Sequence, residues 1–142
     1  MNWKTIFKNI LSKDLTSQQR SFWFIVVHNK VANNELLHRR NMRADPLCSF
    51  CPGIVDDLNH FLFDCGNTRQ IWTQQRSTFL REDRRVASVD QSGWIFPSFN
   101  MFPRRTRTLF LKGFATMICY LIETKRIDRD ISSFNFYIQC NT

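Results

Sequence analysis

Apolar residues recur at helical spacing along most of this chain, and the clearest stripe lies in its last third. From Phe110 onward, apolar positions fall at i, i+1, i+4, i+7, i+8, i+11 and i+12. This period marks the core-facing side of an amphipathic helix, so we predict one helix from about Arg105 to Lys125. Because helical periods dominate the chain, we predict a mainly α fold.

Three shorter helices are predicted in the first part of the chain. An amphipathic helix covers residues 3–11, and Thr16 with Gln19 forms a capping-box pattern that starts a second helix. The second helix is apolar on nearly all sides, so we expect it to be the most buried one. Asn33-Asn34 interrupts the pattern and can cap a third helix over residues 35–40.

The second half of the chain is predicted to be less regular. Helices are expected to begin near Leu58 and to run from about Thr68 to Leu80, followed by a packed, irregular stretch that ends at Pro103. Residues 134–140 alternate with period two, which predicts a short strand. A lone strand needs a partner, and none is evident in the sequence. This segment would therefore pair with a neighbouring domain or pack as an extended tail.

Four residues in the middle of the chain have the spacing of zinc ligands: Cys48-x2-Cys51-x8-His60-x4-Cys65. Two residues between thiols allow one tight turn to present both sulfur atoms, and Pro52-Gly53 supplies turn chemistry. Three thiols and one imidazole form a standard closed zinc set with no position for a catalytic water, so we predict a structural Zn²⁺. The alternative is a metal-free cluster of buried thiols around a core histidine.

The metal site places a condition on the local helix. His60 and Cys65 are five residues apart, which is somewhat more than one turn of a continuous α-helix. They can converge on one metal if that helix is short or frays at Cys65. The neighbouring Asp56-Asp57 is expected to favour the start of this helix through its dipole, rather than to form a polymerase carboxylate pair.

The remaining cysteines and the N-terminus indicate the compartment. Cys119 falls in the apolar stripe of the long helix and is expected to be an inert core residue, which leaves Cys140 unassigned. Lys8 interrupts the only apolar run near the N-terminus, so no secretory signal is predicted, and no run reaches membrane-spanning length. We expect an intracellular protein, nuclear or cytoplasmic, with no membrane partner.

The charge distribution favours a nucleic-acid partner. The net charge is +8, but residues 48–65 contain three aspartates and no lysine or arginine, so the metal segment itself is a poor phosphate binder. Basic residues flank it on both sides. We predict that RNA or DNA phosphates are contacted by Arg39, Arg40, Arg43, Arg104, Arg105 and Arg107. The alternative is that these arginines form solvated faces.

Several short motifs carry a family resemblance. His60-Phe61-Leu62-Phe63-Asp64-Cys65 matches a His-Leu-Phe-x-x-Cys pattern, and Arg69 and Trp72 follow the last cysteine at the family's spacing. Upstream elements agree as well: Phe22-Trp23, His28-Asn29-Lys30, Leu36-Leu37 and Arg39-Arg40. Residues 22–72 resemble the zinc-binding domain that follows the reverse transcriptase in many non-LTR (LINE-type) retrotransposons. Where that family commonly has Leu-Pro-Thr in its linker, this chain has Val31-Ala32-Asn33.

The resemblance implies a division of the chain and a function. A helix and lead-in over 1–21 precede the zinc-binding domain at 22–80, an irregular aromatic loop covers 81–103, and a helix and tail cover 104–142. The family implies a non-catalytic module that helps to hold nucleic acid near a polymerase. Because the chain starts just before the domain, we expect a solo or truncated element copy. The alternative function is a structural zinc domain that docks on a reverse transcriptase domain and has no activity of its own.

Overall fold

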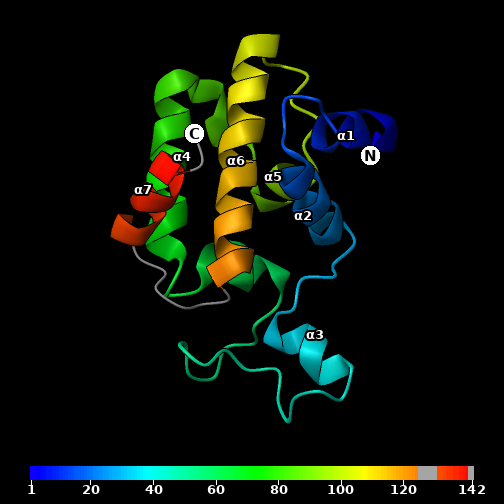
Figure 1. Cartoon of the computed structure of the whole chain (residues 1–142), viewed down its shortest axis with the longest axis vertical. Coiled ribbons are helices and arrows are strands. Elements are labelled where there is room, and N and C mark those ends of the chain that lie inside the picture. The colour runs from blue at the N-terminus through cyan, green and yellow to red at the C-terminus, as the bar shows by residue number, and fades with distance from the viewer. Residues whose placement is uncertain (125–130, 141–142) are drawn as a thin grey trace.

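The computed structural model describes residues 1–124 and 131–140, and it is mainly helical. A central helix, α6 (Arg104–Thr124), has α4 (Arg69–Glu82) and α7 (Ile131–Cys140) on one side and α2 (Ser17–Val27) on the other (Figure 1). Helices α1 (Trp3–Ile10) and α5 (Gln91–Ile95) lie on the same side as α2 and pack against it. A short helix, α3 (Asn34–Arg39), and the loop after it project from one end of this body. The described elements are completed by a π-helical turn, η1 (His60–Asp64), and a 3-10 turn, η2 (Arg84–Ser88).

The long helix α6 confirms the prediction from its apolar stripe, and its buried face organises an aromatic core. Phe114 is fully buried, and its ring lies 5.3 Å from that of Trp23 on α2 and 5.4 Å from that of Trp94 on α5. Phe63 of η1 stacks on the same ring at 5.9 Å. The ring of Trp72 on α4 lies 5.9 Å away, edge-on. One side chain of α6 therefore contacts rings from four other elements, and offset or edge-on ring pairs add to the stabilisation from burial.

The helix ends follow from local sequence. The capping box predicted at Thr16 and Gln19 is present in both directions, and the side chain of Asn33 accepts a hydrogen bond from the backbone of Leu36 at 2.9 Å. Asn29 and Asn41 both have positive φ, of 52° and 57°, directly after the C-caps of α2 and α3. Each closes a Schellman motif, since the backbone N–H of the following residue bonds to a carbonyl five residues earlier.

The predicted strand over residues 134–140 is wrong, because this segment is helix α7. Its apolar residues also fit a helical period: Phe134 is buried, and its ring and that of Tyr137 lie 5.2 and 5.4 Å from the ring of Tyr120 on α6. Phe136, which the period-two pattern placed on the same face as Phe134, is 67% exposed. Contact with α6 therefore selects the 134/137 spacing over the alternation.

Two further expectations need correction. Helix α2 is not the most buried helix, because Phe24 is 43% exposed and Trp23 and Val26 are its buried residues, whereas α6 buries nine. The stretch expected to be irregular before Pro103 contains η2 and α5, whose N-caps are the side chains of Asp83 and Asp90. Its predicted packing is confirmed, since Trp94, Ile95, Phe99 and Phe102 are buried.

Gly113 permits the close approach of α4 and α6. A Cβ built at this position would lie 2.6 Å from Cε1 of Phe79 and 2.9 Å from Nε2 of Gln75, and Gln75 donates a 2.9 Å hydrogen bond to the Gly113 carbonyl. We expect Gly113→Ala to destabilise the protein by about 1–2 kcal/mol, because overpacking against the buried Phe79 ring outweighs the gain in helix propensity. Denaturant unfolding would measure this, with the exposed Lys112→Ala as a control within about 0.5 kcal/mol of wild type. A Gly113→Ala protein as stable as wild type would contradict the close-approach argument.

Candidate metal centre

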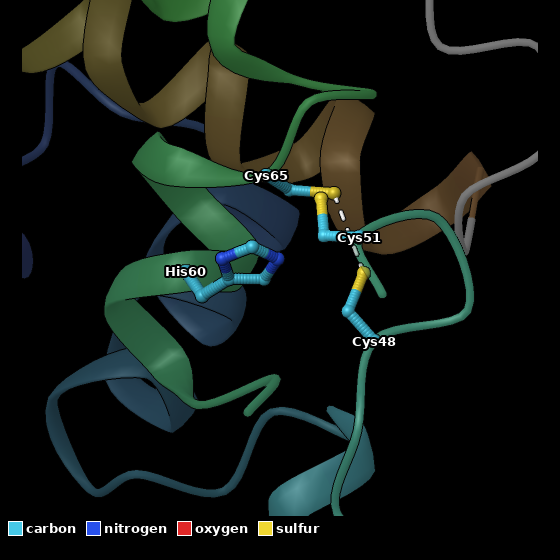
Figure 2. Close-up of side chains that lie close together, drawn as sticks. All are labelled: Cys48, Cys51, His60 and Cys65. Atoms are coloured by element: carbon cyan, nitrogen blue, oxygen red, sulfur yellow. Dashed lines mark hydrogen bonds between the residues drawn. The ribbon is translucent and has the colours of Figure 1, made fainter. Parts of the chain in front are cut away.

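The structure brings together the four side chains that the sequence spacing selected. One ligand atom each from Cys48, Cys51, His60 and Cys65 lies within 4.8 Å of the other three. Figure 2 shows the three thiols and the imidazole ring turned toward one another, with Cys48 and Cys51 on a loop and His60 on the helical turn. Cys48, His60 and Cys65 are buried, whereas Cys51 is partly exposed. Three sulfur atoms and one imidazole nitrogen gathered in this way can hold one zinc ion.

The loop that presents Cys48 and Cys51 is shaped by backbone hydrogen bonds. Leu47 and Val55 form an isolated antiparallel bridge at its base, and the Cys48 amide donates to the Ile54 carbonyl at 2.8 Å. The chain reverses at Gly53, whose φ of +76° is a conformation that residues with a Cβ rarely adopt. The predicted role of Pro52-Gly53 as turn residues is therefore confirmed at Gly53.

A π-helical turn places His60 and Cys65, which are five residues apart, on the same side of the helix. The Cys65 amide donates to the His60 carbonyl at 2.9 Å, which is an i to i+5 hydrogen bond between the two ligand-bearing residues themselves. The wider turn brings residues five apart onto one side, and π turns of this kind are frequent at functional sites. Cys65 then leaves the helical region with φ −61° and ψ 133°. The expectation that the helix ends at Cys65 is confirmed, and the π geometry is the feature that sequence reasoning missed.

The surroundings of the sulfur atoms suit a thiolate site. Backbone amides of Phe50 and Gly66 donate to the sulfur atoms of Cys48 and Cys51 at 3.4 and 3.2 Å. The Cys48 and Cys65 sulfurs are 3.7 Å apart. Burial raises the pKa of the Cys65 thiol to about 12, so in the absence of a cation this thiol stays protonated. A bound Zn²⁺ reverses this preference, because a coordinating thiol is deprotonated and the amide donors then stabilise the anion.

His60 also fits a metal ligand. Its side chain is 6% exposed, and its Nε2 atom has no hydrogen-bond partner among the described residues. A buried polar atom without a partner costs free energy, and a metal ion at the centre of the cluster would remove that cost. The donor set, its burial and this orphaned nitrogen therefore agree with a zinc site rather than with a metal-free core cluster.

The two aspartates before His60 have different roles. Asp57 accepts a 2.9 Å hydrogen bond from the His60 amide, which confirms that it supports the start of this helix. Asp56 instead is fully buried and faces α3. Its Oδ2 atom accepts a 2.8 Å hydrogen bond from the backbone N–H of Asn34, and its backbone carbonyl accepts a 3.1 Å hydrogen bond from the backbone N–H of Glu35. The side-chain amide of Asn34 donates a 2.7 Å hydrogen bond to the Leu47 carbonyl. Asp56 and Asn34 thus fasten α3 to the metal loop, a role that the sequence analysis missed.

The arginines predicted to contact phosphates lie in two separate places. The first cluster is on and after α3, and the second is at the start of α6, at the opposite end of the molecule (Figure 1). In the first cluster, Arg39 pairs with Glu35 and Arg43 pairs with Asp45 at 3.7 Å, while Arg40 is exposed. Among the described residues, Arg104, Arg105 and Arg107 of the second cluster form no ion pair. The two clusters therefore do not form one continuous basic patch.

The other two cysteines lie outside the metal cluster. Cys119 is 2% exposed on α6, and burial, with a further contribution from Glu123, raises the pKa of its thiol to about 12. Such a thiol is a poor nucleophile, in agreement with the prediction of an inert core residue. Cys140 is an exposed free thiol at the end of α7.

Comparison with known proteins identifies the class to which this site belongs. Residues 2–72, half of the chain, match the family described as zinc-binding in reverse transcriptase, and the chain belongs to this family. The resemblance seen in the sequence is thereby confirmed, and Zn²⁺ is the cofactor that the family and the cluster support.

A protein of Arabidopsis thaliana, provisionally named as a ribonuclease H protein, is 27% identical over 73 residues. The aligned region covers 51% of this chain but 12% of that relative. No solved structure matches the chain. Within the part of the chain that the structure describes, no helix has both the length and the apolar content needed to cross a membrane.

Removing one ligand is expected to abolish metal retention. Cys51 is the least buried ligand, so Cys51→Ala removes little packing, and we expect zinc to fall from one ion per chain to none by elemental analysis. Because metal-binding energy is also folding energy, the melting temperature should drop by about 10 °C or more, and a chelator should have the same effect on wild type. Cys140→Ala removes an exposed thiol and should change neither reading. Unchanged melting in both the Cys51 variant and the chelated protein would refute a stabilising zinc.

The buried carboxylate of Asp56 gives a separate test of the loop. Asp56→Ala leaves the backbone N–H of Asn34 without its acceptor. We expect it to lower the free energy of unfolding by about 1–3 kcal/mol while zinc stays bound. Ser49→Ala, at an exposed position in the metal loop, should change stability by less than about 0.5 kcal/mol. Denaturant unfolding with parallel zinc analysis distinguishes the two, and equal stability of the two variants would contradict the fastening role.

Proposed function

We propose that this chain is a non-catalytic zinc-binding module that holds nucleic acid through its basic residues. The observation that carries the first half of this proposal is the closed donor set. Cys48, Cys51, His60 and Cys65 together supply four protein ligands, which fill a tetrahedral zinc. A metal with no open position cannot bind the water or substrate that zinc catalysis requires, so the ion acts on stability and on the placement of the loop.

The second half rests on charge. The chain has a net charge of +8, and the arginines at the start of α6 are not consumed by internal ion pairs among the described residues. Arg104 and Arg105 are exposed, and Arg107 is half-buried beside them. Unpaired arginines on one helical turn can neutralise several phosphates without first breaking an internal bond. The α3 cluster would contribute less, because Arg39 and Arg43 already have carboxylate partners.

The family gives this module its context. A zinc-binding domain associated with reverse transcriptase would hold a template or target strand near the polymerase, in a polypeptide of which this chain covers one part. The Arabidopsis relative is named for ribonuclease H, but the aligned region is 12% of that protein. We therefore propose a ribonuclease H domain only as a neighbour of this module in a larger assembly, and not as an activity of this chain.

A protein-docking role is the second candidate, and one observation favours it. Four apolar side chains around the metal loop are strongly exposed: Leu47 at 37%, Phe50 at 48%, Ile54 at 49% and Val55 at 44%. Exposed apolar patches of this kind often mark interaction surfaces. In this role the zinc would shape a loop that a neighbouring reverse transcriptase domain covers.

The nucleic-acid proposal is tested by the salt dependence of binding. We expect Arg104, Arg105 and Arg107 changed together to Ala to lower the slope of log K against log salt by about 2–3, since each lost phosphate contact removes roughly one unit. Fluorescence anisotropy with a labelled oligonucleotide measures the slope, and circular dichroism checks that the helices remain. The matched triple change of Arg39, Arg40 and Arg43 should lower the slope less. An unchanged slope in the α6 variant would remove this helix start from the contact surface.

A further inference from the structure

The face of the molecule around α1 carries a group of aromatic side chains that remain exposed or only partly buried, with Phe7 and Phe96 packed at the edge of the core. Trp3 is 48% exposed and Phe24 is 43% exposed. Trp3 stacks near Phe7 at 5.8 Å, and Phe24 lies 4.2 Å from the ring of His28, which is itself exposed. Phe96 supports Trp3 edge-on at 5.6 Å. We refer to these five rings, Trp3, Phe7, Phe24, His28 and Phe96, as the aromatic platform.

A basic row runs beside this platform on the same helix. Trp3 and Phe7 are four residues apart, as are Lys4 and Lys8, so the two pairs form neighbouring rows along α1. Both lysines are exposed, and residues 1–13 contain no acidic side chain. An aromatic row and a cationic row lie side by side within the length of two helical turns.

Lys8 also lines a cleft between α1 and the start of α6. This cleft has a volume of about 360 Å³, and its polar walls include Ser12, Asp14, Arg104, Arg107 and Thr108. Among the described residues, Lys8, Arg104 and Arg107 take part in no ion pair. Asp14 is the one acidic residue of the lining, and its carboxylate accepts from the hydroxyls of Ser12 and Thr108 at 3.3 and 3.4 Å. The cleft therefore keeps a net positive charge.

We propose that α1 and the start of α6 form a binding surface for single-stranded nucleic acid, with phosphates in the basic cleft and unpaired bases stacked on the aromatic platform. This inference rests on the proposed nucleic-acid function and specifies its ligand. Aromatic faces beside a positively charged groove are the combination that binds single strands with little sequence preference. Duplexes bury their base faces, so they would use the cations alone. A protein partner is less favoured, because the centre of a protein interface is depleted of charged residues, whereas lysines line this platform.

Trp3 makes the proposal directly measurable. Trp23 and Trp94 are fully buried and Trp72 is half-buried, whereas Trp3 is 48% exposed, so Trp3 is the most accessible of the four tryptophans to acrylamide. The difference in quenching between wild type and Trp3→Leu isolates its contribution from that of Trp72. We expect a 12-nucleotide single-stranded RNA to protect Trp3 from acrylamide and a duplex RNA of the same sequence to protect it much less. In anisotropy titrations, Trp3→Leu should weaken single-strand binding about tenfold and leave duplex binding and the salt slope unchanged.

Three controls separate stacking from its alternatives. Trp3→Tyr keeps an aromatic face and should restore most of the affinity, and Leu11→Ala, at an apolar position 50% exposed just after α1, should change nothing. Lys8→Ala should lower the salt slope by about 1 for both RNAs. If the wild type binds with a steep salt slope but Trp3→Leu binds as tightly, the platform is refuted while the nucleic-acid function stands. If Trp3→Leu loses duplex binding equally, base stacking is likewise refuted. If neither RNA binds at low salt, and single-stranded and duplex DNA of the same sequence do not bind either, the proposed function fails, and this inference fails with it.

Discussion

The convergence of three sulfur atoms and one imidazole nitrogen is the constraint on which the projecting part of the structure, α3 and the metal loop after it, depends. Residues 47–55 contribute little to the main core, because Leu47, Phe50, Ile54 and Val55 all remain exposed. Apart from backbone bonds and the Asn34 side-chain bond to Leu47, the loop is held where Cys48 and Cys51 meet His60 and Cys65. A zinc ion at that point replaces the apolar burial that so small a loop cannot supply.

The metal cluster acts together with a buried hydrogen-bond network rather than alone. Asp56 lies between the loop and α3, and Asn34 completes the connection to Leu47. On the other side, Phe63 lies within η1 between the ligands His60 and Cys65, and its ring stacks on Phe114 of α6. The π turn therefore has two roles: one side presents the metal ligands, and the other packs into the aromatic core.

The family motifs acquire physical reasons once they are placed in the fold. The His28-Asn29-Lys30 step is a helix terminator, in which Asn29 takes the left-handed conformation, and Asn41 does the same after α3. The ring of Trp72, seven residues after the last cysteine, lies 4.9 Å from that of Phe63, and this contact ties α4 to the ligand-bearing turn. The arginine clusters, in contrast, lie at opposite ends of the molecule, so they do not form one continuous patch.

The sequence by itself determined the ligand set, the long helix α6 and most helix starts, because each depends on residues close together in the chain: thiol spacing, apolar period and capping side chains. Only the tertiary structure decided the rest. Residues 134–140 fit two periods, and contact of Phe134 and Tyr137 with Tyr120 selected the helix. Asp56 looks like its neighbour Asp57 in the sequence, but α3 folds back over it and buries it. The aromatic platform and the basic cleft also arise from side chains distant in sequence, which a local pattern cannot bring together.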